Sequence, residues 1–242
     1  MGIQALAGGR VLAEKFGDKP AKVVALHGWG RSGADFTKIL SGLPALAIHL
    51  PGFGPTAPPD KVWGTPEYAE LVAEAIEPFA PVVLVGHSFG GRIAVRIAAS
   101  RPELVSGIVL TGAPLIRLTA KTKPNPGYRI FRFLNRAGIV SDKAMEKRRR
   151  KSGSADYLAA QGVMRDIMVK TVNENYEADL AKIKAPTWLV WGENDTAAPV
   201  AAGRVASEKI SGSKWKLIPG EGHLLTEKLG LAVRDAIVEA VK

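Results

Sequence analysis

A serine stands between two glycines at residues 86–90, in the sequence GHSFG. The apolar run PVVLV precedes it and the helical pattern RIAVRIAAS follows it. A strand that turns abruptly into a helix needs small residues on both sides of a nucleophile held in a strained conformation. The pattern therefore predicts that Ser88 is a nucleophile and that the Phe89 amide, at the helix amino terminus, donates to an oxyanion. The alternative is an ordinary turn, because the pattern also arises by chance.

Four histidines are candidates for the base that a weak serine nucleophile requires. His223 lies in the sequence PGEGH after the last apolar run, on a loop flexible enough to present an imidazole at the edge of a sheet. His27 ends an early apolar run inside a glycine-rich loop and is interpreted as structural, whereas His49 ends another run with no evident partner. We expect the side chain of His87 to point away from Ser88 as a buried polar group. His223 is therefore the predicted base.

A carboxylate must fix the tautomer of this base and stabilise its imidazolium form. Asp195, in the sequence WGEND, directly follows the preceding apolar run. The order Ser88, Asp195, His223 matches that of one known triad scaffold. Some members of that scaffold place the acid one strand earlier, but residues 111–116 contain no acid, which favours Asp195. Glu193 is a nearby competitor, and capping of the next helix is the alternative role for both carboxylates.

The sequence HGWG at residues 27–30 forms a second glycine-rich loop after an early apolar run. Glycines there let the backbone approach a ligand and aim an N–H group at an oxyanion. Trp29 is predicted to provide that amide, and a plain tight turn is the alternative. Four separately weak signals in the right order are together much stronger than any one.

Short apolar runs bounded by glycine or proline alternate with longer helical patterns along the chain, which is typical of an α/β protein with a mainly parallel sheet. The first twenty residues are expected to form one or two irregular antiparallel strands. The other expected strands are residues 22–26, 46–50, 82–85, 107–110, 187–191 and 214–218, and the expected helices are residues 66–79, 92–100, 200–210 and 225–241.

One interval breaks this alternation, because residues 115–186 separate two expected strands. Loops in α/β units usually take about two to six residues, so this interval is an insertion. Its helical stretches, at residues 127–137, 142–151 and 155–171, predict a cap over the carboxyl ends of the strands, where ligands of open α/β sheets bind. The expected domains are a core of residues 1–114 and 187–242 and a helical cap of residues 115–186.

The chain resembles the α/β-hydrolase superfamily over nearly its full length. The resemblance rests on the sequences HGWG (27–30), LPGFG (50–54), GHSFGG (86–91), WGEND (191–195) and GEGH (220–223). It implies a mostly parallel eight-stranded sheet flanked by helices, an inserted helical cap, and a mechanism that needs no cofactor or metal. The chain departs from many relatives at His49, where they carry Asp, and at Pro55 and Thr56, where a Ser is common after the glycines.

The resemblance also implies a mechanism. Ser88 would attack a carbonyl, His223 would shuttle the proton, and a water activated by His223 would release the acyl-enzyme. Because haloalkane dehalogenases and epoxide hydrolases use a carboxylate nucleophile, Ser88 argues against both. Carboxylesterases, carbon–carbon bond hydrolases of ring-cleavage products, cofactor-free haloperoxidases and thioesterases share a serine triad, and the motifs do not separate them.

The formal net charge of +10 belongs to one segment. Residues 115–151 contain 12 Lys or Arg against two acids, while the rest of the chain is neutral. Helical spacing places three arginines on one face, and five consecutive bases follow. The candidate contacts to an anionic partner are Arg129, Arg132, Arg136, Arg148, Arg149 and Arg150.

A solvated helix face is the simplest interpretation of this charge, and the alternatives are an anionic substrate, an acidic carrier protein or an anionic membrane. The HGWG loop and the arginine-bearing cap somewhat resemble esterases that demethylate pimeloyl groups on acyl carrier protein. Nucleic acid is not expected, because no recognised binding motif accompanies the charge. Phe131, Leu134 and Leu224 are the candidate lining of the substrate pocket.

The chain contains no cysteine, which excludes thiolate catalysis and cysteine-ligated metals. It shows neither a signal peptide nor an apolar run long enough to span a bilayer, so a cytoplasmic location is expected. We expect a serine esterase acting on a small, largely apolar carboxylic ester. The alternatives are a carbon–carbon bond hydrolase, a hydrolase of carrier-protein esters or thioesters, and a ligand-sensing receptor that keeps the fold.

Overall fold

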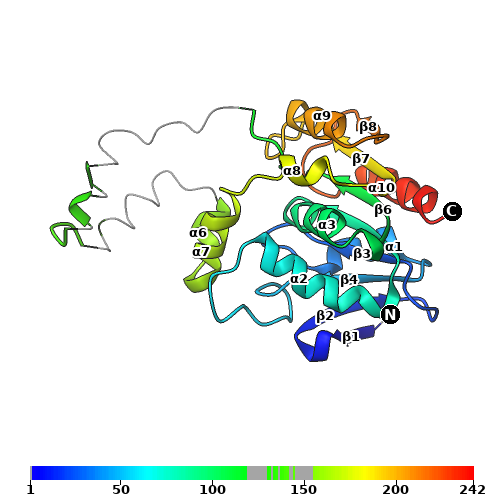
Figure 1. Cartoon of the computed structure of the whole chain (residues 1–242), viewed down its shortest axis with the longest axis horizontal. Helices are drawn as coiled ribbons and strands as arrows, with labels where there is room; N and C mark the ends of the chain where they lie inside the picture. Colours follow the sequence, from blue (N-terminus) through cyan, green and yellow to red (C-terminus); the bar gives the residue numbers. More distant parts are fainter. Residues whose placement is uncertain (1, 119–129, 132, 136, 142–143, 145–154) are drawn as a thin grey trace.

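A central sheet of eight strands carries the fold, in the order β1-β2-β4-β3-β5-β6-β7-β8 (Figure 1). The computed structural model describes residues 2–118, 130–131, 133–135, 137–141, 144 and 155–242. The strands are β1 (Gly2–Leu6), β2 (Val11–Phe16), β3 (Val23–Leu26), β4 (Ala45–His49), β5 (Val82–His87), β6 (Val105–Thr111), β7 (Thr187–Gly192) and β8 (Lys214–Ile218). From β4 to β8 along this order, neighbouring strands are parallel, which confirms the expected fold class.

Helices cover both faces of the sheet. On one face lie α1 (Thr37–Leu40) and α10 (Glu227–Ala240). On the other lie α2 (Thr65–Ile76), α3 (Phe89–Ser100), α8 (Glu177–Leu180) and α9 (Val200–Lys209). Short 3-10 turns at Ala7–Gly9, Gly33–Phe36, Glu77–Phe79 and Pro102–Leu104 complete the connections.

Strand β5 shows why these residues form a buried sheet. Val82 and Leu84 pack under α2 and α3, whereas Val83 and Val85 pack under α1 and α10. Successive side chains of a strand point to opposite faces, so a continuous apolar run suits a strand covered on both sides. The strand therefore holds the residue that follows it, Ser88, on a rigid support.

The first strands are more regular than the sequence suggested. Strands β1 and β2 form an antiparallel hairpin with an unbroken register from Gly2 opposite Lys15 to Leu6 opposite Val11. Gly8 and Gly9 adopt positive φ angles in the connecting turn, a conformation that glycine takes without steric strain. The expected antiparallel pairing is confirmed, but the expected irregularity was wrong, because strand β2 also pairs along its length with β4.

The insertion between β6 and β7 contains α6 (Ala155–Ala159) and α7 (Gly162–Thr171), on the side of the molecule away from α10 (Figure 1). The single helix expected over residues 155–171 is interrupted, because Gln161 is extended and Gly162 has a φ of +50°. The helix expected over residues 127–137 is confirmed at 130–131 and 133–135, and that over 142–151 falls mostly outside the described residues. The domain boundaries stay a prediction.

Two arginines of α3 anchor the ends of this insertion. The Arg92 guanidinium donates to the carbonyl oxygens of Pro114 and Thr171, each at 3.3 Å. One turn later, Arg96 forms an ion pair with Asp179 and lies over the Tyr176 ring, 4.6 Å from its centroid. Helix α3, which begins directly after Ser88, therefore contacts the chain both where the insertion starts, at Pro114, and where it ends, at Thr171 and Asp179.

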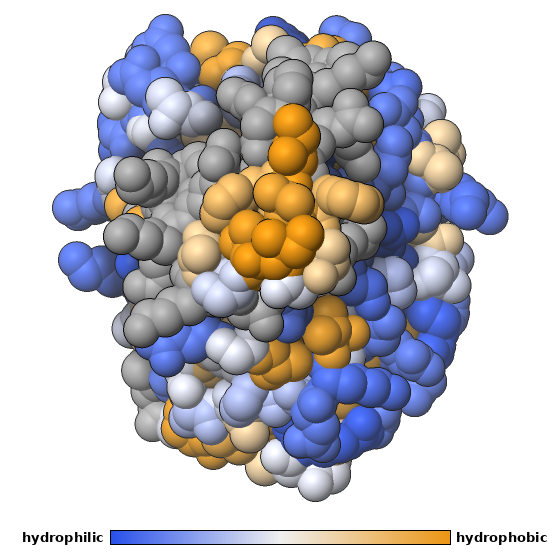
Figure 2. All heavy atoms as spheres, turned by 90° about the vertical axis from the view of Figure 1, so that its left-hand side faces the viewer, coloured by the Kyte–Doolittle hydropathy of each residue, from blue (hydrophilic) through white to orange (hydrophobic). Residues whose placement is uncertain are grey.

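Apolar side chains are exposed on the inserted segment. Ile130, Phe133 and Ile139 are 61%, 70% and 71% exposed. Figure 2 views the molecule from the side of the insertion and shows hydrophobic atoms gathered there. None of the helices in the described part of the chain has the length and apolar character needed to span a bilayer.

Candidate active site

Ser88 occupies a strained turn between β5 and α3. Its φ and ψ angles are 50° and −111°, a region that non-glycine residues rarely adopt and that costs about 1–3 kcal/mol. The turn is possible only between glycines, because a Cβ on Gly86 would lie 2.4 Å from the Gly91 Cα and one on Gly90 would lie 2.1 Å from the Leu26 carbonyl oxygen. The strained strand-to-helix turn expected from the sequence is thus present.

A continuous chain of hydrogen bonds joins the three side chains that the sequence singled out. The Ser88 Oγ lies 3.0 Å from the His223 Nε2, and the His223 Nδ1 lies 2.8 Å from the Asp195 Oδ2. Because the carboxylate can only accept, Nδ1 carries the proton and Nε2 presents its lone pair to the serine hydroxyl. The imidazole is therefore in the tautomer that a general base requires.

Asp195 is the most buried of these side chains, at 1% exposure against 23% for His223. Its Oδ1 also accepts hydrogen bonds from the Ala197 and Ala198 amides, at 2.9 and 2.7 Å. These bonds hold the loop before α9 but do not cap that helix, whose N-cap is Pro199 with no side-chain hydrogen bond, so the alternative capping role of Asp195 was wrong. Glu193, the competitor, instead accepts from the Gly220 amide at 3.0 Å.

The HGWG loop packs directly against the serine. A Cβ added to Gly28 would lie 3.3 Å from the Ser88 Cβ, and the Gly90 amide donates to the His27 carbonyl oxygen at 3.0 Å. Among the backbone–backbone hydrogen bonds of the described residues, none has the N–H of Trp29 or of Phe89 as its donor. Donation from these two amides to an oxyanion stays a prediction.

The buried histidine of this loop, His27, holds the loop in place. It is 0% exposed, its Nδ1 lies 2.7 Å from the Gly28 carbonyl oxygen, and the Leu50 amide donates to its Nε2 at 3.0 Å. Burial, with a smaller contribution from the neighbouring His49, lowers the pKa of His27 to about 4, while the hydrogen bond to the Gly28 carbonyl oxygen and the charge of Asp35 oppose the shift. The structural interpretation of this residue agrees with its contacts.

Aromatic rings pack against Phe89, the residue that follows the serine. The Trp29 ring packs edge to face with Phe53 and Phe89, with centroids 5.0 and 5.2 Å apart. Met164 of α7 covers Gly52, where an added Cβ would lie 2.3 Å from the Met164 sulfur. The LPGFG loop and the insertion thus meet in an apolar wall.

Three features of the site went unrecognised in the sequence. His49 has partners, since its Nδ1 accepts from the Gly33 amide at 3.2 Å and its Nε2 lies 3.4 Å from Glu14. Gly112, with a φ of +55°, leaves room for the paired side chains of His223 and Asp195, because a Cβ there would lie 3.0 Å from the His223 Nδ1. His87 contacts the His223 main chain. A glycine two residues after the expected strand 107–110 was the available signal for Gly112.

The predicted pocket residues lie on two segments. Phe131 and Leu134 are half-buried in the insertion, and Leu224, next to His223, is 58% exposed. Their role in holding a substrate stays a prediction. The six candidate arginines, at positions 129, 132, 136 and 148–150, lie outside the described residues.

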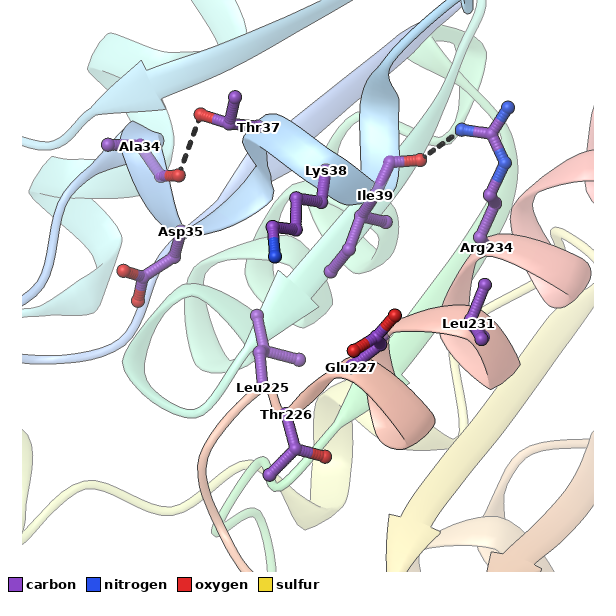
Figure 3. Close-up of a pocket in the computed structure, with 11 residues that line it drawn as sticks. Ala34, Asp35, Thr37, Lys38, Ile39, Leu225, Thr226, Glu227, Leu231 and Arg234 are labelled. Atoms are coloured by element: carbon purple, nitrogen blue, oxygen red, sulfur yellow. Dashed lines mark hydrogen bonds between the residues drawn. The ribbon is translucent and has the colours of Figure 1, made fainter.

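A cleft of about 460 Å³ lies behind the histidine loop, between α1 and the start of α10 (Figure 3). Ile39, Leu225 and Leu231 form apolar parts of its lining, and Arg234 donates to the Ile39 carbonyl oxygen. One of its lining residues, Leu225, lies two positions after His223 in the sequence, and Ser88 is not among the lining residues. Among the described residues, no three His, Asp or Glu side chains gather as a metal site would require.

The chain belongs to the alpha/beta hydrolase family, whose sequence profile matches residues 23–236. This result confirms the expected family and the expectation of an enzyme.

Relatives and solved structures agree with this assignment. The chain is 34% identical to the esterase Rv0045c of Mycobacterium tuberculosis over 113 residues, covering 45% of this chain and 38% of that protein. It is 26% identical to the pimeloyl-[acyl-carrier protein] methyl ester esterase of Neisseria meningitidis, over 85% of this chain and 87% of that one. The esterase EaEST of Exiguobacterium antarcticum has the same fold, with a TM-score of 0.72, 20% identity, and coverage of 99% of this chain and 98% of that one.

Proposed function

We propose that the protein hydrolyses carboxylic esters through an acyl-enzyme, with Ser88 as nucleophile, His223 as base and Asp195 as the carboxylate that orients the base. The observation that carries the proposal is the hydrogen-bonded path from the Ser88 Oγ through the imidazole to Asp195, with bonds of 3.0 and 2.8 Å. Three segments far apart in sequence meet to build it. Membership of the alpha/beta hydrolase family supports the same reading.

The reaction follows from this arrangement. His223 takes the hydroxyl proton as the Ser88 oxygen attacks the ester carbonyl, and then gives the proton to the leaving alcohol. Asp195 stabilises the imidazolium that forms between these steps. A water activated by the same imidazole then attacks the acyl group and restores the free serine.

The developing oxyanion needs hydrogen-bond donors, and the Trp29 and Phe89 amides are the proposed pair. Phe89 opens helix α3, whose amino terminus favours negative charge. A single donor of this kind contributes about 10²–10³-fold to kcat in a known serine protease.

The rings of Trp29, Phe53 and Phe89 favour a substrate with an apolar acyl or alcohol group. An apolar wall with few polar groups rewards burial of hydrocarbon surface. A series of p-nitrophenyl esters with acyl chains of increasing length tests this preference, and kcat/KM is expected to rise with chain length.

A second candidate is the ester or thioester of an acyl group attached to an acidic carrier protein. The pimeloyl-[acyl-carrier protein] methyl ester esterase of N. meningitidis matches most of this chain, and residues 115–151 hold 12 bases against two acids. Complementary charge speeds the encounter of such partners. The same positive charge would also attract an anionic membrane. In a receptor, Ser88 would not act as a nucleophile.

The deciding experiment is a panel of an ester, a thioester and a carbon–carbon diketone substrate, each measured with wild type and with Ser88→Ala. We expect ester turnover by the wild type and its loss in the variant. Cleavage of the diketone alone would assign carbon–carbon hydrolysis instead. Wild-type turnover that survives in Ser88→Ala would reject Ser88 as the nucleophile.

A further inference from the structure

The ring of His87 bridges the two segments that bear the nucleophile and the base. His87 is the last residue of β5 and immediately precedes Ser88. Its Nε2 lies 2.9 Å from the main-chain carbonyl oxygen of His223, and the two rings lie 5.0 Å apart. The serine and the base are therefore connected through one buried side chain, independently of the bond between the Ser88 Oγ and the imidazole.

The direction of this hydrogen bond follows from its partners. A carbonyl oxygen can only accept, so the His87 Nε2 carries the proton and its Nδ1 has a lone pair. That Nδ1 is buried with no hydrogen-bond partner among the described residues, and it faces Gly28, where an added Cβ would lie 3.0 Å away. An unpaired buried acceptor is unfavourable, and an apolar ring would avoid it. The donation to His223 is the contact that a histidine makes here and an apolar ring cannot.

A hydrogen bond to the His223 carbonyl oxygen restrains the loop that carries the proposed base. The loop between β8 and α10 lacks regular structure, and Leu224 within it is 58% exposed. The main chain of this loop is also held before residue 223, where the Asn194 amide donates to the Glu221 carbonyl oxygen at 2.7 Å and the Gly220 amide donates to Glu193 at 3.0 Å. A bond at residue 223 itself limits the movement of the imidazole relative to the serine.

We propose that His87 is a positioning residue, which holds the loop of the base by donating from Nε2 to the His223 carbonyl oxygen. The inference rests on the proposed serine-hydrolase function. A displacement of about 1 Å in a reacting group costs as much as 10²-fold in rate. Loss of the bond therefore lowers kcat, while substrate binding changes little.

The uncharged state of the ring suits this role. Burial, and then the charge of His223, lower the pKa of His87 to about 4, while Asp35 and Asp195 oppose the shift. His87 thus stays neutral when the neighbouring imidazole takes the proton of the serine. A neutral donor holds the loop without repelling the imidazolium.

Three substitutions separate the hydrogen bond from packing. His87→Gln places an amide nitrogen near the position of Nε2, His87→Asn reaches only the position of Nδ1, and His87→Leu is apolar. We expect His87→Asn and His87→Leu to lower kcat for a p-nitrophenyl ester by about 10–100-fold with KM nearly unchanged, and His87→Gln to stay within about threefold of wild type. Hydrogen exchange of residues 219–226 should rise in the first two variants and not in His87→Gln.

Equal kcat in His87→Asn and His87→Gln would overturn the proposal, and so would unchanged exchange of the loop in His87→Asn. If His87→Leu does not fold, the Asn and Gln pair still decides. Failure of the proposed function has a different signature, because a wild type without esterase activity, or Ser88→Ala with full activity, leaves the exchange comparison intact. The two hypotheses therefore fail separately.

Discussion

Two buried histidines should make the stability of this protein fall in mild acid. His27 and His87 are 0% and 2% exposed, and burial lowers the pKa of each to about 4 from the ordinary value of 6.5. The unfolded chain therefore binds a proton on each ring at a higher pH than the folded protein does. Their contribution is fully present above about pH 6.5 and is lost as the pH falls toward 4.

The size of the effect follows from the difference between the folded and unfolded pKa of each ring. A tenfold difference in proton affinity corresponds to about 1.4 kcal/mol, so each ring removes about 3 kcal/mol of folding free energy once the pH is below 4. At pH 5 the loss is about 2 kcal/mol for each ring. Against a typical total of about 5–15 kcal/mol, this is a large fraction.

The variant His87→Gln isolates one ring, because glutamine does not titrate and keeps a donor near the His223 carbonyl. Urea unfolding at pH 8 and at pH 5 should show a loss of unfolding free energy that is smaller in the variant by about 2 kcal/mol. The carboxylates that titrate nearby are common to both proteins, so their contribution cancels. Equal losses in wild type and variant would refute the assignment of acid lability to His87.

Three further predictions concern the site and its surroundings. Asp195→Asn should lower kcat by about 10⁴-fold, as in the known protease case, because the amide forces the imidazole into the wrong tautomer. Glu193→Gln is the matched control, and its kcat should stay near that of the wild type. A large loss of kcat in Glu193→Gln and not in Asp195→Asn would assign the acid to Glu193. Gly90→Ala should destabilise the protein by more than about 3 kcal/mol in thermal unfolding, because its Cβ would lie 2.1 Å from the Leu26 carbonyl oxygen, and a stable variant would contradict the packing described. Replacing the three arginines at 148–150 by glutamine should weaken binding of an acidic acyl carrier protein in low salt but not in high salt. Binding that changes neither with the substitutions nor with salt would support a solvated helix face.

Much of the site could be predicted because its residues follow strands. The carboxyl ends of parallel strands meet at one edge of a sheet, so a serine after β5, an aspartate after β7 and a histidine after β8 converge when the strands are placed in order. Glycines mark the turn that carries the serine, since Gly86 and Gly90 lie closer to other backbone than a Cβ permits. Local sequence therefore carried most of the argument.

Other features depend on contacts between distant segments, which local patterns do not encode. The donation from His87 to the His223 carbonyl joins residues 136 positions apart. The pairing of Arg96 with Asp179 is similar, since it forms only when the chain returns from the insertion to helix α3. The break between α6 and α7 was missed because the apolar spacing continues through Gly162, whose positive φ ends that regularity.

The central claim is that Ser88 forms a covalent intermediate. Intact-protein mass spectrometry after treatment with a fluorophosphonate tests it directly, followed by proteolysis to locate the adduct. One phosphonyl group on the peptide that contains residue 88, absent from Ser88→Ala and strongly slowed in His223→Gln, is the expected result. An adduct elsewhere, or none in the folded wild type, would contradict the account.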